Sequence, residues 1–221
     1  MATKAFDIMD VLKSSWENFK KAPFLLIGLL FLSVVVSLLT NLLVSFIPSI
    51  IMVIILSIIS WMAGSYIMLS FIRASLILAN GEIPSWDVLK NDKNIYFKFF
   101  GASILLSLIL VFATFLFVIP MVLATAIFFP VVYIVVDKKN IGIIDAFKRS
   151  WEIATPQFVS CIIFIILMFI LSIIGMIPLG LGLLIVVPIM YISGAIIYKK
   201  LDAAADSDTV EAPVETITSE N

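Results

Sequence analysis

Three long blocks without a charged residue constrain what this chain can fold into. They cover residues 22–72, 99–136 and 153–198 and are 51, 38 and 46 residues long. An α-helix crosses the hydrocarbon core of a bilayer in about 20 apolar residues, so each block is long enough for two spans. A helix buried in a soluble domain needs no uncharged run of this length. The sequence therefore predicts an all-α integral membrane protein with six transmembrane helices arranged as three hairpins.

Proline residues and the ends of the uncharged blocks set the expected bounds of the spans. Pro48, Pro120 and Pro178 divide the blocks, and proline suits the first turn of a helix, where its missing N–H has no helical partner. Pro130 and Pro188 lie inside the fourth and sixth spans and should kink them, because proline removes a helical hydrogen bond. The expected spans cover about residues 23–46, 49–71, 99–119, 121–136, 157–177 and 178–198.

A short polar segment occurs twice, each time before an uncharged block. Residues 10–17 are Asp-Val-Leu-Lys-Ser-Ser-Trp-Glu and residues 145–152 are Asp-Ala-Phe-Lys-Arg-Ser-Trp-Glu, with five of eight positions identical. A degenerate third copy around Trp86 precedes the second block. We expect amphipathic surface helices on the cytoplasmic side at residues 1–22, about 84–96 and about 141–155.

The first of these segments has apolar residues at helical spacing. Phe6, Met9, Leu12, Trp16 and Phe19 recur every three or four residues, which places them along one helix face. An aromatic face flanked by lysines suits the headgroup layer of a membrane. The alternative is an ordinary helix that packs against the loops of the bundle.

The spans carry a second repeat. Residues 119–134 and 177–192 share the pattern Ile-Pro, nine residues, Pro, two residues, Tyr-Ile, at an offset of 58 positions. The sequence therefore predicts an internal repeat of surface helix, span, proline turn and span, with all copies in the same orientation. The matched residues are Pro120, Pro130 and Tyr133 in the first copy and Pro178, Pro188 and Tyr191 in the second.

The charged residues indicate the orientation of the chain. All of them fall on one side of the expected spans, and Lys and Arg mark the cytoplasmic side of a membrane protein. We therefore expect both termini to be cytoplasmic. Residues 201–221 hold six acidic residues and no basic one, which favours a disordered acidic tail.

Tryptophan and basic side chains on this side are the expected lipid contacts. A basic cluster attracts anionic headgroups, although the orientation rule alone also places basic residues there. The expected partners are membrane lipids, in particular anionic ones, with a protein partner or a second copy of the chain as further candidates. The expected interfacial anchors are Trp16, Trp86, Trp151, Lys13, Lys20, Lys21, Arg73, Lys138, Lys139, Lys148 and Arg149.

Few residues offer catalytic chemistry. The sequence has no histidine, and Cys161 is its single cysteine. It contains no phosphate-binding loop, nucleophile elbow or zinc-protease motif. The uncharged blocks lack the acidic and basic residues that ion-coupled transporters place within the membrane. We therefore expect no catalytic residue, no cofactor, no metal site and no nucleic-acid partner.

Three short motifs together resemble a known family. They are Lys-x-Ser-Trp-Glu before a span, Gly-Glu-Ile-Pro-Ser-Trp at residues 81–86 and the closing Ile-Pro hairpin with its Pro-x-x-Tyr. Over about residues 5–200 the chain resembles prokaryotic six-span proteins related to the membrane domain of glycerophosphoryl diester phosphodiesterases. The resemblance implies a multi-pass protein of the prokaryotic cytoplasmic (inner) membrane. It implies no catalytic residue, because the phosphodiesterase activity belongs to a separate soluble domain.

Three functions remain open. The first is a non-enzymatic protein that organises or binds lipids or a partner protein at the cytoplasmic face. The second is a transporter or permease subunit for a neutral or apolar solute, with Pro130 and Pro188 in its moving helices. The third is a lipid-headgroup enzyme, which would use an acidic residue such as Glu152.

Overall fold

The computed structural model describes residues 6–47, 49–116, 118–177 and 180–210. All regular structure in these residues is helical, and six of the described helical segments are long and apolar enough to cross a membrane. The prediction of an all-α, six-span architecture is confirmed, and the chain is a polytopic membrane protein. The candidate spans are Pro23–Ser45, Ile50–Ala79, Lys93–Phe115, Ile119–Asp137, Ile143–Met176 and Leu183–Ser207.

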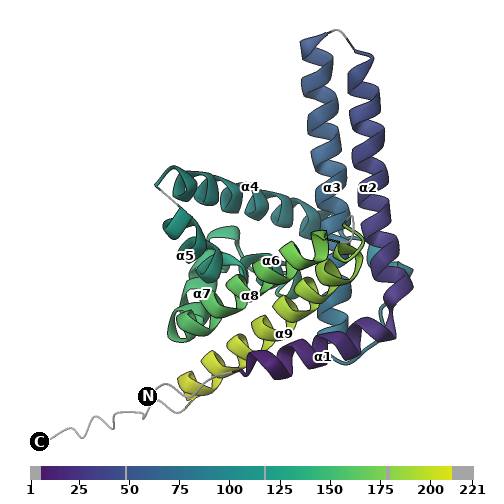
Figure 1. The fold of residues 1–221 in the computed structure, drawn as a ribbon. Coiled ribbons are helices and arrows are strands. Elements are labelled where there is room, and N and C mark those ends of the chain that lie inside the picture. The colour runs from purple at the N-terminus through teal and green to yellow at the C-terminus, as the bar shows by residue number, and fades with distance from the viewer. Residues whose placement is uncertain (1–5, 48, 117, 178–179, 211–221) are drawn as a thin grey trace, which may run out of the picture.

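The first hairpin consists of α2 (Pro23–Ser45) and α3 (Ile50–Ala79). Pro23 lies at the first position of α2, while Pro48 lies outside the described residues. With 30 residues α3 is about 45 Å long, and it continues eight residues past the expected end at Phe71. Figure 1 shows the outer part of this hairpin extending away from the other helices. Among the described residues from 30 to 64, none is buried.

The second hairpin consists of α4 (Lys93–Phe115), followed by α5 (Val118–Phe128) and α6 (Val131–Asp137). Helix α4 begins six residues before the expected Phe99, because Asp92 caps it by accepting the N–H of Asn94 at 2.8 Å. Pro120 lies in the first turn of α5 rather than between two helices. Pro130 separates α5 from α6 and precedes the first residue of α6.

The third hairpin consists of α8 (Phe158–Met176) and α9 (Leu183–Val210). Pro178 lies outside the described residues, whereas α9 continues through Pro188. The two helices approach closely where Gly175 meets Gly182, because a Cβ atom added to Gly182 would lie 2.7 Å from the Cα of Gly175. Residues 201–210, which we expected in a disordered tail, belong to α9.

Two of the three expected surface helices are present. Helix α1 (Ile8–Lys21) lies along α9 in Figure 1, and α7 (Ile143–Ala154) leads through the 3-10 helix η2 (Thr155–Gln157) into α8. The third expected surface helix, at 84–96, is not formed as one continuous helix. The 3-10 helix η1 (Trp86–Leu89) is followed by an irregular segment, and α4 then begins at Lys93. The cap at Asp92 explains why the helix starts there.

The buried core lies where the C-terminal half of α3 packs against α6 and α9. Ile72 of α3, Ile134 of α6 and Ile197 of α9 are fully buried, and Phe99 of α4 joins them. We call the described residues of 7–21, 80–98, 137–152 and 199–207 the charged face.

Candidate functional site

Helices α1 and α7 each bury one serine against the membrane helices. Ser15 and Ser150, which correspond in the repeated segment, are both fully buried. Ser15 accepts a hydrogen bond from Ser193 of α9 at 2.8 Å, and Ser150 donates to the carbonyl oxygen of Ile127 in α5 at 2.7 Å. Each serine therefore joins its surface helix to a membrane helix.

The other side of each helix is exposed and combines tryptophan with lysine. On α1, Met9, Lys13 and Trp16 are exposed and lie along one face, because they are four and three residues apart. Ile144, Lys148 and Trp151 of α7 have the same spacing and are also exposed. We call these six residues the Trp–Lys faces. Trp16 is 44% exposed and Trp151 is 53% exposed.

Not all of the predicted aromatic face of α1 is exposed. Phe6 and Phe19 are buried in the core, while Met9 and Trp16 remain at the surface. The rings of Trp16 and Phe19 stack with centroids 5.9 Å apart. Helix α1 thus packs on the bundle through one part of its surface and exposes Met9, Lys13 and Trp16.

Trp86 and Arg73 hold the connection between α3 and α4. The ring of Trp86 lies against α2, where a Cβ atom added to Gly28 would be 2.7 Å from the ring. Arg73 donates from Nη1 to the carbonyl oxygen of Lys90 at 2.9 Å and to the side-chain oxygen of Asn91 at 2.7 Å. Asn91 in turn donates to Ser70 at 2.8 Å. The guanidinium group of Arg73 therefore binds the connecting segment.

Two tyrosines complete this polar network. Tyr66 of α3 donates to the carbonyl oxygen of Leu89 at 2.6 Å, and Tyr96 of α4 donates to the carbonyl oxygen of Met62 at 3.0 Å. Their rings pack with centroids 5.5 Å apart. These bonds fix the segment from 86 to 92 against α3, although the segment has little regular structure.

Acidic residues at the end of α9 pair with two of the predicted anchors. Asp202 accepts a hydrogen bond from Lys138 at 2.9 Å and one from Arg149 Nε at 2.9 Å. Arg149 also pairs with Asp206, and its Nη1 lies 3.8 Å from Glu152. The side chain of Asp202 is only 14% exposed. Lys138 and Arg149 therefore form ion pairs within the protein.

A second ion pair joins α6 to α9. Lys199 lies 2.9 Å from Asp137, and Tyr198 donates to the same carboxylate at 2.8 Å. At the connection between α3 and α4, Lys90 pairs with Asp87 at 2.7 Å. The hydrogen bond from Lys90 lowers the pKa of Asp87 below its ordinary value, and a second hydrogen bond from Ser85 acts in the same direction.

The remaining predicted anchors are at the surface of α1 and of the turn after α6. Lys20 and Lys139 are exposed, and Lys21 donates to the side-chain oxygen of Asn18 at 2.8 Å. The structure thus does not bring the eleven predicted anchors together at one point. Ten of them lie on the charged face and Arg73 lies in α3, and several of them form internal contacts.

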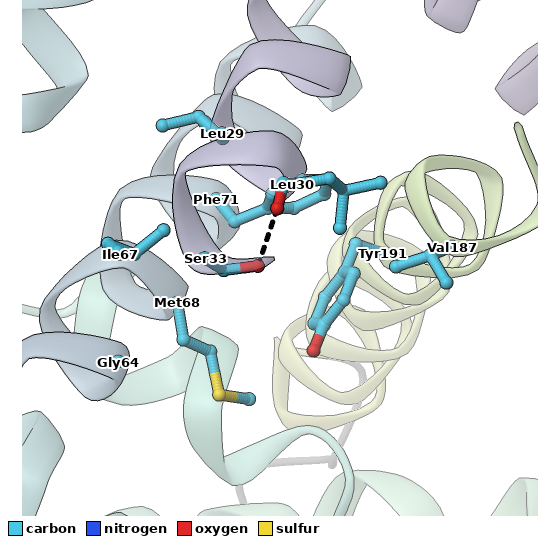
Figure 2. Close-up of a pocket in the computed structure, with 9 residues that line it drawn as sticks. All are labelled: Leu29, Leu30, Ser33, Gly64, Ile67, Met68, Phe71, Val187 and Tyr191. Atoms are coloured by element: carbon cyan, nitrogen blue, oxygen red, sulfur yellow. Dashed lines mark hydrogen bonds between the residues drawn. The ribbon is translucent and has the colours of Figure 1, made fainter. Parts of the chain in front are cut away.

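Several crevices open between the membrane helices, and two of them are lined in part by α9. Figure 2 shows the first, which has a volume of about 150 Å³ and lies between α2, α3 and α9. Its only hydroxyl groups among the drawn residues belong to Ser33 and Tyr191, and Ser33 donates to the carbonyl oxygen of Leu30 at 2.7 Å. The second crevice has a volume of about 230 Å³ and is mostly apolar, with Phe129, Phe164 and Met190 in its wall.

The described residues contain no group of three or more acidic, cysteine or histidine side chains that could hold a metal ion. Cys161 is buried in α8. Comparisons with protein-family models, with curated proteins and with solved structures found no match for this chain. The geometry of the charged face and of the crevices is therefore the basis for a functional proposal.

Sequence reasoning did not identify the acidic partners. Asp137 and Asp202 connect α6 and α7 to α9, yet they appear in the sequence only as the end of a span and the start of a tail. One signal was available, because Asp202 and Asp206 are four residues apart and would share a helix face if α9 continued.

Proposed function

We propose that this protein is a non-enzymatic membrane protein that binds and organises anionic lipids at the cytoplasmic face of a prokaryotic inner membrane. The observation that carries the proposal is the pair of Trp–Lys faces on α1 and α7. Both faces present an aliphatic residue, a lysine and a tryptophan at the same spacing, and all six side chains are exposed.

This combination suits the boundary between lipid and water. A tryptophan places its ring among the upper acyl chains while its N–H stays near polar groups. A lysine next to it buries its aliphatic stem and extends its ammonium group to the headgroups. Since each helix is joined to the bundle by a buried serine, the two faces have defined positions relative to the spans.

The ion pairs of the charged face agree with a binding role. Asp202 and Asp206 neutralise Lys138 and Arg149 within the protein. Lys13, Lys20 and Lys139 have no carboxylate partner among the described residues, which leaves their charge available to lipid. Each basic residue near an anionic membrane surface contributes about 1 kcal/mol of attraction.

Native mass spectrometry of the protein extracted gently from its own membrane tests the proposal. We expect an anionic lipid to remain bound to the wild-type protein and to be lost when Trp16 and Trp151 are both replaced by alanine. Trp61→Ala is the matched control, because Trp61 is equally exposed but lies in the outer hairpin. A wild-type protein without lipid, or a double variant that retains it fully, would contradict the proposal. A bound protein in place of lipid would point to partner organisation.

A second candidate function is the passage of a neutral or apolar solute. The apolar crevice of about 230 Å³ beside Phe129 favours it, because the helix next to this crevice is interrupted at Pro130. An interruption in a membrane helix leaves backbone groups without helical partners and allows the two parts to move separately.

Flux through proteoliposomes tests this alternative. Replacing Pro130 and Pro188 by alanine should stiffen the two helices and reduce the flux of an apolar solute. The variant Pro84→Ala serves as control, because Pro84 lies outside the spans. Equal flux in empty liposomes and in proteoliposomes would exclude transport of that solute.

A further inference from the structure

Two lysines without a carboxylate partner meet beside the start of α4. Lys98 donates from Nζ to the backbone carbonyl oxygen of Lys139 at 2.8 Å. Lys139 belongs to the turn that follows α6, 41 positions along the chain. Neither lysine forms an ion pair in the described part of the chain, whereas Lys138 and Lys199 do. The hydrogen bond holds the ammonium group of Lys98 at the backbone of Lys139, whose own charged side chain is exposed.

A hollow of about 510 Å³ opens at these lysines. Lys98 and Lys139 line it together with Asn94, Asn140 and Asp92. The side-chain amides of Asn94 and Asn140 form no hydrogen bond among the described residues. Each amide offers two N–H donors. The hollow therefore combines two cations with several unused donors, which is the arrangement that phosphate oxygens accept.

The net charge of the lining residues suits an anion. Two lysines and one aspartate give a net charge of +1. Asp92 stays near the start of α4, because its carboxylate accepts the N–H of Asn94. A phosphodiester carries a single negative charge and matches this lining.

The position of the hollow indicates that the phosphate belongs to a lipid. Lys98 lies about 7 Å along α4 from Lys93, where a candidate span begins. Lys139 lies two positions after the end of another candidate span at Asp137. Phe97 also lines the hollow and is largely exposed. The cations therefore lie where spans emerge from the hydrocarbon core, with an apolar ring beside them.

We infer that this hollow binds the phosphodiester group of a phospholipid, with Lys98 and Lys139 as its ligands. Asn94 and Asn140 donate further hydrogen bonds to the phosphate oxygens. The inference rests on the proposed function, because it requires the charged face to meet lipid. It names one specific site within that face, distinct from the Trp–Lys faces.

Titration of the full-length protein with phosphatidylglycerol in neutral detergent, followed by native mass spectrometry, tests the inference. We expect one tightly bound lipid for the wild type and an apparent affinity at least about ten-fold lower for Lys98→Gln with Lys139→Gln. Glutamine keeps a donor but removes the charge. The matched control is Lys93→Gln, which removes a nearby charge outside the hollow and should leave the affinity unchanged. Arginine at both positions should restore binding.

A further probe distinguishes the source of the phosphate. Glycerophosphoglycerol, the same phosphodiester without acyl chains, should not displace the lipid. Displacement by glycerophosphoglycerol at equal concentration would overturn the assignment to a lipid.

The outcome can be separated from that of the proposed function. If lipid retention depends on Trp16 and Trp151 but not on Lys98 and Lys139, the specific site is wrong and the broader proposal stands. If the lysine variants lose the lipid while the tryptophan variants keep it, the Trp–Lys faces are not the lipid-binding surface. The melting temperature of each variant without added lipid confirms that it is folded.

Discussion

The hydroxyl group of Tyr133 in α6 donates to the backbone carbonyl oxygen of Tyr191 in α9 at 3.0 Å. The two tyrosines occupy matching positions in the predicted repeat of the spans, 58 residues apart. Their contact brings α6 and α9 together beside Gly194, whose lack of a side chain makes room for the Tyr133 ring. A Cβ atom at this position would overlap with the hydroxyl group.

We expect Gly194→Ala to lower the stability of the protein. The added methyl group meets the buried ring of Tyr133, and overpacking of a core typically costs about 1–3 kcal/mol. The melting temperature in a mild detergent measures the effect. Tyr133→Phe alone should have a smaller effect, because it removes one hydrogen bond worth about 0.5–1.5 kcal/mol.

The double variant distinguishes this explanation from a general sensitivity of α9. Phenylalanine removes the atom nearest to the added methyl group, so the two changes together should cost less than the sum of their separate costs. Additive costs would show that Gly194 acts through something other than Tyr133.

We expect Asp202→Asn to destabilise the attachment of α9 to α6 and α7. Lys138 and Arg149 both bind this carboxylate, and charged hydrogen bonds of limited exposure contribute about 1.5–3 kcal/mol. Asp206→Asn is the control, because its side chain is 66% exposed and its ion pair is more strongly screened by solvent. Equal melting temperatures for the two variants would contradict the central role of Asp202.

We expect Arg73→Met to release the connection between α3 and α4. Arg73 donates hydrogen bonds to the backbone of Lys90 and to the side chain of Asn91. Its loss should therefore make residues 80–92 accessible to protease without separating the membrane helices. Limited proteolysis followed by mass spectrometry locates the cleavage. Lys90→Met should leave the cleavage pattern unchanged, since the side chain of Lys90 is at the surface and its backbone carbonyl remains.

We expect Gly28→Ala to move the ring of Trp86 away from α2. The new Cβ atom would lie 2.7 Å from the ring, and the half-exposed tryptophan can turn outward. The fluorescence emission of Trp86, measured with the other tryptophans replaced by phenylalanine, should shift to longer wavelength. Gly64→Ala is the control, because no atom lies within 4 Å of its added Cβ. An unchanged emission would show that the contact is absent in the membrane.

The expected orientation can be tested with a membrane-impermeant thiol reagent. In a Cys161→Ser background, Glu82→Cys should react only from the cytoplasmic side of the membrane, because basic residues accumulate there. Ser49→Cys, in the outer turn, should react only from the opposite side. The reverse pattern would contradict the placement of both termini in the cytoplasm.

The sequence predicts the spans well because their signal is local. Length and absence of charge decide whether a helix can cross a bilayer, and all three uncharged blocks contain helical pairs in the structure. The ends are harder to predict, because they depend on contacts between distant residues. Helix α3 continues past Phe71 because its C-terminal half is buried against other helices. Helix α4 begins at Lys93 because Asp92 caps it.

The candidate sites depend even more on distant contacts. The exposure of Trp16 and Trp151 follows from helical spacing once the buried side is known. No local pattern places Lys98 beside Lys139, or Asp202 between Lys138 and Arg149. In each case the partners are separated by more than 40 positions, so only the packing of the helices brings them together.

The hairpin of α2 and α3 packs against the core only through the start of α2 and the C-terminal half of α3. Leu25, Leu26 and Leu29 are buried, whereas no described residue from 30 to 64 is. Helices in a thinner bilayer reduce their mismatch by tilting, which costs only fractions of a kcal/mol per Å. The outer hairpin can tilt without separating a buried contact, so differences in bilayer thickness are absorbed there while the core and the charged face keep their geometry.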